Sequence, residues 1–161
     1  MRRAVLAGSF DPITEGHMDV LRRGLGLFDE VVVAIGNNPR KQYLLDLETR
    51  TQILEECIEG LSRVRVDSFD GLLVEYCQDV GATAILRGLR AVSDFEFEFQ
   101  IGLANKNMAP DVETVFLLTA SENIFVSSSL VKEIAQNGGD VRNYVPEPVL
   151  LPLERALKGG A

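Results

Sequence analysis

The chain begins with the stretch RAVLAGSFDPITEGH at residues 3–17, which predicts the start of the fold and a site within it. Arg3 to Ala7 is a short apolar run typical of a strand, and Gly8 ends it. A helix is expected to begin near Thr14, with one face formed by Met18, Leu21, Leu25 and Phe28. A glycine turn between strand and helix is a layout that binds phosphate, because backbone amides and the positive helix end face the same space.

The same alternation continues along the rest of the chain. Val31 to Ile35 is an apolar run suited to a strand buried on both faces. Further strands are expected at Val64–Val66, Thr83–Leu86 and Val115–Thr119, and further helices at Leu47–Leu61, Leu72–Val80, Ser93–Asn107 and Leu130–Gln136. Pro146, Pro148 and Pro152 indicate only a short terminal segment.

This alternation predicts an α/β fold. We expect one Rossmann-like, doubly wound domain over residues 1–161, with a five-stranded parallel sheet and helices on both faces. Ligands of such sheets bind outside the carboxyl ends of the strands. Ser9, Asn37, Arg87 and Ala120 should therefore lie together at one edge of the sheet.

Composition narrows the possible partners. The net charge of −8 argues against DNA or RNA, which requires a broad basic face, although a small anion can still be bound by a few local cations. No apolar stretch is long enough to span a bilayer, so we expect no membrane partner and a cytoplasmic protein. Cys57 and Cys77 have no partner at metal-ligand spacing and are expected to be buried, reduced thiols.

His17 is the single histidine of the chain and lies at the expected helix start, directly after Gly16. A lone histidine is often a surface residue or a hydrogen-bonded core residue, but this position would let it donate a hydrogen bond to phosphate. Asp11 and Thr14 are expected to have structural roles rather than to take part in the chemistry. Asp11 is expected to organise the loop, and Thr14 is expected to cap the helix.

A serine triplet, Ser127 to Ser129, precedes the last predicted helix. Such a triplet commonly forms a helix cap, and the same hydroxyls and amides can bind phosphate. The aromatic stripe on the Ser93–Asn107 helix, which includes Phe95 and Phe99, is interpreted as core or subunit contact.

Three motifs resemble a known family. GSFDPITEGH at residues 8–17 is similar to the signature of the adenylyltransferase and cytidylyltransferase superfamily. RGLRAVSDFEFE at residues 87–98 and FVSSSLVKE at residues 125–133 resemble the later motifs of bacterial-type phosphopantetheine adenylyltransferases, in the same order and spacing. The resemblance implies transfer of the adenylyl group of ATP to 4′-phosphopantetheine, giving dephospho-coenzyme A and pyrophosphate.

The resemblance also implies Mg²⁺ as a cofactor, held mainly by the ATP phosphates, so no protein ligand for a metal is expected. It implies a homohexamer and possible feedback inhibition by coenzyme A, which shares the pantetheine arm with the substrate.

Roles for individual residues follow from the resemblance. The catalytic set would be His17, which stabilises the transition state at the α-phosphate, Lys41, which bridges the two phosphates, and Arg90 on the triphosphate. The acceptor would be bound by Ser9, Lys41, Arg87 and, along its pantetheine arm, Leu73. The ATP site would comprise Ser9, Phe10, His17, Gly88, Leu89, Arg90, Glu98, Asn123, Ile124, Phe125, Val126, Ser127, Ser128 and Ser129.

Two alternatives stay open. One is a transferase of the same superfamily that acts on another phosphorylated acceptor, such as nicotinamide mononucleotide or glycerol phosphate; the RGLR and SSSLVK segments argue against it. The other is a non-catalytic, nucleotide-binding regulatory module, against which the joint presence of the polar candidates argues. Asn123 departs from the pattern, because close relatives commonly carry an aromatic residue there.

Overall fold

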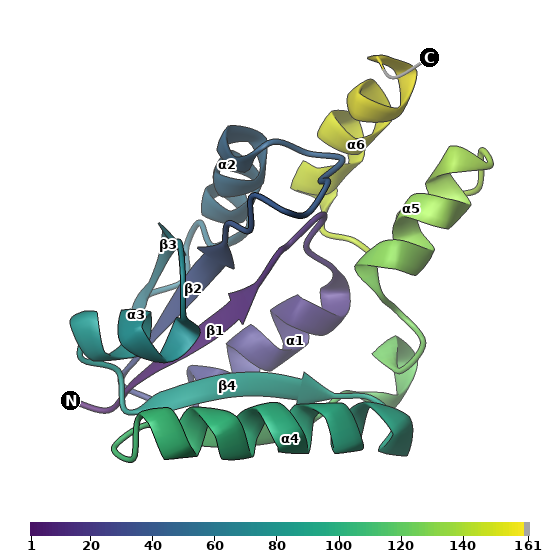
Figure 1. Ribbon diagram of the computed structural model, residues 1–161. Coiled ribbons are helices and arrows are strands. Elements are labelled where there is room, and N and C mark those ends of the chain that lie inside the picture. Colours follow the sequence, from purple (N-terminus) through teal and green to yellow (C-terminus); the bar gives the residue numbers. More distant parts are fainter. Residues whose placement is uncertain (160–161) are drawn as a thin grey trace.

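One parallel sheet organises the molecule. The structure is a computed structural model that describes residues 1–159, apart from the side chains of Val92 and Ser93, so residues 160–161 of the predicted domain lie outside it. In this range five strands pair in the order β3-β2-β1-β4-β5 (Figure 1). Their bounds are β1 Arg3–Gly8, β2 Glu30–Gly36, β3 Val64–Phe69, β4 Ala84–Leu89 and β5 Glu113–Leu118. The order reverses direction between β1 and β4, which confirms the doubly wound fold class.

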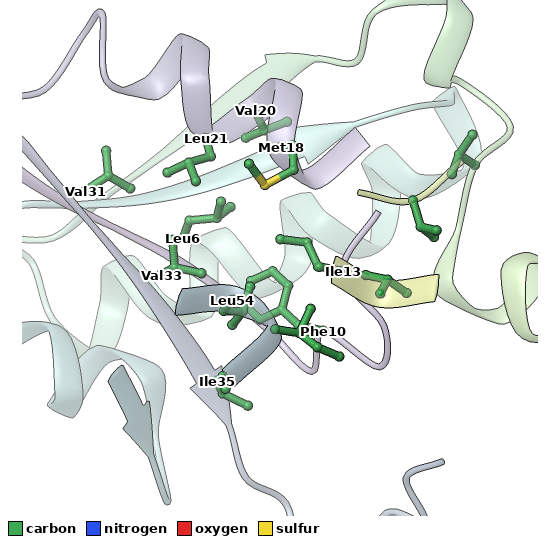
Figure 2. Close-up of a cluster of buried hydrophobic side chains, with 14 of the residues drawn as sticks. Leu6, Phe10, Ile13, Met18, Val20, Leu21, Val31, Val33, Ile35 and Leu54 are labelled. Carbon is green, nitrogen blue, oxygen red and sulfur yellow. The ribbon is translucent and has the colours of Figure 1, made fainter. Parts of the chain in front are cut away.

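Helices cover both faces of the sheet. They are α1 Glu15–Gly24, α2 Leu47–Cys57, α3 Leu73–Asp79, α4 Val92–Met108, α5 Ser128–Gln136 and α6 Glu147–Gly159, with a 3₁₀ turn at Ser121–Asn123. Because strand side chains alternate, Leu6 and Val33 face a core closed by α1, α2, α5 and α6 (Figure 2). Val5 and Val32 face the other side, where α3 packs. Figure 1 shows α4 running alongside β4.

The C-terminal segment differs from its sequence prediction. It forms α6, a 13-residue helix with Pro152 inside it, rather than a short segment broken by prolines. Pro152 removes one intrahelical hydrogen bond, yet Val149 and Leu153 are buried against the main core. Tertiary packing of this apolar stripe therefore outweighs the proline signal.

The ends of α1, α2 and β4 differ by a few residues from the ends predicted from the sequence. Helix α1 ends at Gly24, so Leu25 and Phe28 follow the helix while still packing against the core. Helix α2 ends at Cys57, and Gly60 closes the following turn at φ +79°. Strand β4 extends through Leu89, so most of the RGLR motif lies within the strand rather than after it.

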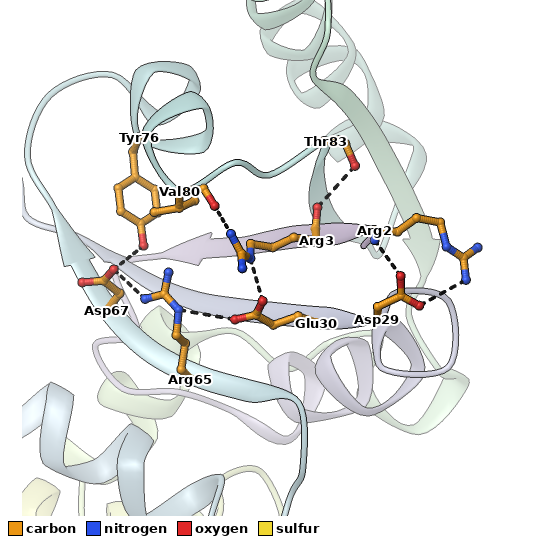
Figure 3. Close-up of polar contacts among 9 residues, drawn as sticks. All are labelled: Arg2, Arg3, Asp29, Glu30, Arg65, Asp67, Tyr76, Val80 and Thr83. Carbon is orange, nitrogen blue, oxygen red and sulfur yellow. Dashed lines mark hydrogen bonds and ion pairs between the residues drawn. The ribbon is translucent and has the colours of Figure 1, made fainter.

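A polar network joins neighbouring strands on the face of the sheet that α3 covers (Figure 3). The Arg3 side chain donates to Glu30 Oε2 at 2.6 Å and also to the Val80 carbonyl. Arg65 pairs with Asp67 at 2.8 Å, and the Tyr76 hydroxyl donates to the same carboxylate at 2.7 Å. These contacts join β1, β2, β3 and the end of α3 on this face of the sheet.

Candidate active site

The site begins where two neighbouring strands separate. Pairing between β1 and β4 ends at Leu6 and Leu86, while β1 continues along β2 to Gly8 and β4 continues along β5 to Leu89. Arg87, the next residue of β4, donates from Nη1 to the Ala7 carbonyl at 3.1 Å and so spans the gap. This is the topological switch point of the sheet, where doubly wound proteins bind ligands.

Two clefts open beside Arg87. The first has a volume of about 570 Å³ and lies among the starts of α1, α4 and α5 and the end of β4. The second has a volume of about 770 Å³ and lies between the β1 and β2 ends and the start of α3. Ala7, Gly8 and Arg87 line both. A ligand in one cleft therefore meets a ligand in the other at the β1 turn.

The first cleft gathers most of the residues predicted to bind ATP. Its lining includes His17, Gly88, Arg90, Glu98, Val126, Ser127, Ser128 and Ser129. It also contains residues that the sequence did not single out for ligand contact, namely Thr14, Gly16, Val20, Asp94, Phe97 and Thr119. A signal for Thr14 and Gly16 was present, since both belong to the motif around His17.

His17 is oriented by the cap of its own helix. Thr14 is the N-cap of α1, its hydroxyl accepts from the His17 backbone N–H at 3.4 Å, and its backbone N–H donates to His17 Nδ1 at 3.1 Å. This reciprocal arrangement is a capping box with histidine in the third helical position. Because Nδ1 accepts a hydrogen bond, the ring proton lies on Nε2. The capping role predicted for Thr14 is confirmed.

The surroundings of His17 keep its ring neutral. Burial, followed by the positive charges of Arg87 and Arg90, lowers the pKa of His17 from 6.5 to about 4. The ring also meets Phe10 edge-to-face at 5.3 Å. At neutral pH the imidazole is therefore a fixed hydrogen-bond donor through Nε2, and it carries no charge of its own.

The two arginines of the RGLR motif are held in place by acceptors. Arg87 makes a forked pair with Glu98 of α4, with Nε to Oε2 at 2.9 Å and Nη2 to Oε1 at 2.6 Å. Arg90 donates to the Val126 carbonyl at 3.0 Å and pairs with Asp94 at 3.4 Å. Guanidinium groups fixed in this way can present their remaining N–H groups to phosphate oxygens.

Gly88, between these arginines, has a packing reason to be glycine. A Cβ at this position would lie 3.0 Å from Cγ2 of Val20 on α1. The glycine therefore lets α1, and with it His17, lie close against the end of β4.

The start of α5 completes the first cleft. Ser127 is the N-cap and accepts from the Leu130 N–H at 3.1 Å, which confirms the predicted capping role. Ser128 donates to the Pro12 carbonyl at 2.8 Å, and Ser129 is exposed. The first backbone N–H groups of a helix attract anions, so this end of the cleft is electropositive.

The second cleft contains the four residues predicted to bind the acceptor. Ser9, Lys41, Leu73 and Arg87 all line it. Its walls also include the side chains of Tyr43, Phe69 and Leu72, with exposed Arg40 and Lys41 at the rim. The cleft thus combines a cationic end with an apolar wall.

Several predicted ATP residues lie outside the lining of the first cleft. Phe10 is buried in the core at φ +48°, and Leu89 is the last residue of β4. Asn123 lies behind Gly16, where a Cβ on the glycine would be 3.8 Å from the Asn123 Cβ. Ile124 and Phe125 are exposed, and the Phe125 ring meets Tyr144 edge-to-face at 5.5 Å. Contacts of these residues with ATP stay predictions.

Other sequence predictions concern residues away from the clefts. Cys57 and Cys77 are free thiols, but only Cys77 is fully buried; burial raises the pKa of each to about 12.

In the part of the chain that the structure describes, no helix is long and apolar enough to cross a membrane.

Sequence reasoning missed two charged residues behind the β1 turn. Arg50 of α2 is 1% exposed and donates to the Ser9 carbonyl at 2.8 Å. Lys132 of α5 pairs with buried Asp11 at 2.9 Å. Asp11 accepts from the backbone of Leu44 and Leu45, which confirms its predicted role in organising the loop. Arg50 and Lys132 lie in helices whose sequence pattern does not predict these contacts with Ser9 and Asp11.

The fold and the two joined clefts define a doubly wound α/β protein with a candidate ligand site at its switch point. The cytidylyltransferase-like family model matches residues 5–134. The chain is 50% identical to the phosphopantetheine adenylyltransferase of Desulfatibacillum aliphaticivorans, over 98% of this chain and 90% of the relative. It is 52% identical to the phosphopantetheine adenylyltransferase of Caldanaerobacter subterraneus subsp. tengcongensis, over 92% of this chain and 93% of that relative. The chain belongs to the cytidylyltransferase-like family and, within it, to the phosphopantetheine adenylyltransferase family.

A solved structure supports the fold. The chain resembles a protein from Vibrio parahaemolyticus described as a candidate nicotinate-nucleotide adenylyltransferase, with a TM-score of 0.70 over 98% of this chain and 95% of that one. The sequence identity is 21%, so this likeness concerns the fold alone.

Proposed function

We propose that this chain transfers the adenylyl group of ATP to 4′-phosphopantetheine, forming dephospho-coenzyme A and pyrophosphate in coenzyme A biosynthesis. The observation that carries the proposal is the meeting of two clefts at Arg87, one with an anion-binding helix start and the other with a cationic end and an apolar wall. The family of the chain supports the same reaction.

In this proposal ATP occupies the first cleft. Its β- and γ-phosphates lie against Arg90 and the start of α5, where backbone N–H groups and serine hydroxyls can donate to them. Its α-phosphate lies near Nε2 of His17. Glu98, already paired with Arg87, would contact the nucleoside.

The acceptor occupies the second cleft. Its phosphate lies among Ser9, Lys41 and Arg87, and its pantetheine arm lies along the apolar wall that includes Leu73. Because Arg87 lines both clefts, it can hold the acceptor phosphate at the point where it approaches ATP.

The reaction requires alignment of two anions rather than a protein nucleophile. An oxygen of the acceptor phosphate attacks the α-phosphorus, the bond from that phosphorus to the oxygen of the leaving pyrophosphate breaks, and no group is oxidised or reduced. His17 donates through Nε2 to an α-phosphate oxygen, where negative charge develops. Lys41 and Arg87 reduce the repulsion between the two phosphates.

Mg²⁺ is proposed to accompany ATP. In the described range no group of three or more His, Cys, Asp or Glu side chains could hold a metal ion. The proposed ion is one bound mainly by phosphate oxygens and water, as is common for Mg²⁺. When bound, the ion would neutralise charge on the triphosphate.

A panel of acceptors tests the proposed function. Purified protein is incubated with ATP, Mg²⁺ and either 4′-phosphopantetheine, nicotinamide mononucleotide or glycerol phosphate, and pyrophosphate release is measured. We expect release with phosphopantetheine and a product mass of dephospho-coenzyme A. Release with another acceptor alone would favour the first alternative, and ATP binding with no release from any acceptor would favour a regulatory module.

The proposal extends to assembly. Helix α4 exposes large apolar side chains on two sides: Phe95, Phe99 and Leu103 follow one face at a spacing of four residues, and Phe97 and Ile101 lie on another. Monomeric proteins rarely leave such contiguous apolar faces uncovered, so further copies of this chain are the proposed partners, in a homohexamer. Sedimentation of the purified protein should give the mass of six chains, and a monomer would contradict this.

Regulation and location are also part of the proposal. Coenzyme A carries the same pantetheine arm as the acceptor, so it is proposed to inhibit by occupying the second cleft and to raise the apparent KM for phosphopantetheine. A cytoplasmic location is proposed as well.

A further inference from the structure

Arg50 is a buried cation that contacts carbonyl oxygens and a ring rather than a carboxylate, among the residues described. Its Nε donates to the Leu45 carbonyl at 3.0 Å and the Asp46 carbonyl at 3.3 Å, and its Nη1 donates to the Ser9 carbonyl at 2.8 Å. Its guanidinium lies 4.0 Å from the centre of the Tyr43 ring. Burying a charge is costly, so these contacts must hold it in one position.

These contacts join the two segments that line the acceptor cleft. Ser9 follows β1, whereas residues 37–46 connect β2 to α2 and carry Lys41. Asp11 strengthens the same junction with the opposite charge, because its carboxylate accepts from the Leu44 N–H at 2.9 Å and the Leu45 N–H at 2.8 Å. The junction is thus held through both backbone donors and backbone acceptors.

Tyr43 extends the junction to Lys41. Its ring lies against Arg50, while its hydroxyl accepts from the Asn38 N–H at 3.0 Å and donates to the Gly36 carbonyl at 3.4 Å. The Lys41 N–H in turn donates to the Asn38 carbonyl at 3.0 Å. A continuous path of contacts therefore runs from Ser9 through Arg50 and Tyr43 to the backbone of Lys41.

The turn that Arg50 supports is also strained. Phe10, next to Ser9, has φ +48°, a left-handed conformation that a non-glycine residue keeps only where its neighbours enforce it. Arg50 holds the carbonyl directly before this residue. This contact fixes the direction of the Ser9 carbonyl oxygen, which points toward Arg50.

We infer that Arg50 is a positioning residue for the acceptor, which fixes the Ser9 turn and the Lys41 loop relative to each other so that both can contact one phosphate. The inference rests on the proposed function. It concerns the second cleft, because the groups of the first cleft are held by other contacts, such as Thr14 on His17 and the Val126 carbonyl on Arg90.

Steady-state kinetics of Arg50→Met and Arg50→Lys test this inference. Because misplacement by about 1 Å can cost about 10²-fold, we expect Arg50→Met to lower kcat/KM for phosphopantetheine by about that factor, with the KM for ATP within about threefold of wild type. The kcat/KM of Arg50→Lys for phosphopantetheine should lie between the values of Arg50→Met and wild type, since one ammonium group cannot reach all three carbonyls. Arg63→Met is the matched control, because exposed Arg63 also contacts only carbonyls, those of Leu25 and Phe28, and lines neither cleft.

The outcomes separate this inference from its alternatives. An equal rise in both KM values would assign Arg50 a merely structural role, and an unchanged kcat/KM for the acceptor would overturn the inference directly. If the Arg50 variants do not fold, Tyr43→Phe decides: loss of its hydroxyl should raise the acceptor KM and leave the ATP KM unchanged, and no change in the acceptor KM would refute the path to Lys41. Failure of wild type to use phosphopantetheine would refute the proposed function instead.

Discussion

The backbone N–H of Thr14 donates to Nδ1 of His17 at 3.1 Å, so the histidine that lines the first cleft is held by the cap of its own helix. The two residues that cap the start of α1, Thr14 and His17, therefore also line the site. The consequence is a ring with a fixed tautomer, whose Nε2–H is the group available to a ligand.

The first prediction separates the cap from the chemistry. Glutamine in the third helical position also completes a capping box, so His17→Gln should keep stability near wild type, whereas His17→Ala should lose the cap contact. Both variants should bind ATP nearly normally and lower kcat by about 10²–10³-fold, as expected when a transition-state donor is removed. ATP binding by calorimetry and single-turnover rates measure the two effects. A His17→Gln variant with wild-type kcat would show that the ring donor is not required.

The second prediction concerns pH. The pKa of His17 is about 4 in the folded chain and ordinarily 6.5, because burial and then Arg87 and Arg90 disfavour the charged ring. Between these values the unfolded chain binds more protons, so the stability associated with neutral His17 is fully present above pH 6.5 and is lost as the pH falls toward 4. Urea unfolding at about pH 7.5 and about pH 5 should show a larger loss for wild type than for His17→Gln. Equal losses would mean that the pKa of His17 is not lowered.

The third prediction uses the pair that Arg87 makes with Glu98. Glu98→Gln removes the charge from a forked contact in which both distances are below 3.0 Å, so Arg87 should lose its fixed orientation. Because Arg87 lines both clefts, kcat/KM should fall by roughly 10-fold for ATP and for the acceptor alike, the equivalent of about 1.4 kcal/mol. Steady-state kinetics with each substrate varied in turn would measure this. A loss confined to ATP would instead indicate that Glu98 contacts only the nucleotide.

The fourth prediction concerns the Tyr76 hydroxyl, in the polar network on the α3 face of the sheet. Tyr76→Phe removes the hydroxyl that donates to Asp67 but keeps the ring stacked on Phe69 at a centroid distance of 4.9 Å. Loss of one such hydrogen bond should lower the free energy of unfolding by about 1 kcal/mol, with kcat and both KM values unchanged. Denaturant unfolding and kinetics on the same preparation test both halves. Altered kinetics would contradict this prediction and show that the hydroxyl also positions the Phe69 wall of the second cleft.

Local sequence patterns predicted the elements that depend on residues close to one another in the sequence. The apolar runs of β1 and β2 and the turn from Gly8 to His17 depend on neighbouring residues, so their strands, cap and site position could be read from the chain. Helix α6 could not, because the contacts that bury Val149 and Leu153 outweigh its prolines only in the folded core. Arg50 resembles any helical arginine in sequence, since its partner Ser9 lies 41 residues away.

The central claim is that the acceptor phosphate reaches ATP directly where the two clefts meet at Arg87, with no protein nucleophile between them. The stereochemical course at the α-phosphorus tests it most directly. The reaction is run with one diastereomer of adenosine 5′-O-(1-thiotriphosphate), and the configuration of the thio-substituted dephospho-coenzyme A product is determined. A single in-line displacement predicts inversion. Net retention would require a covalent adenylyl-enzyme intermediate and would contradict the claim.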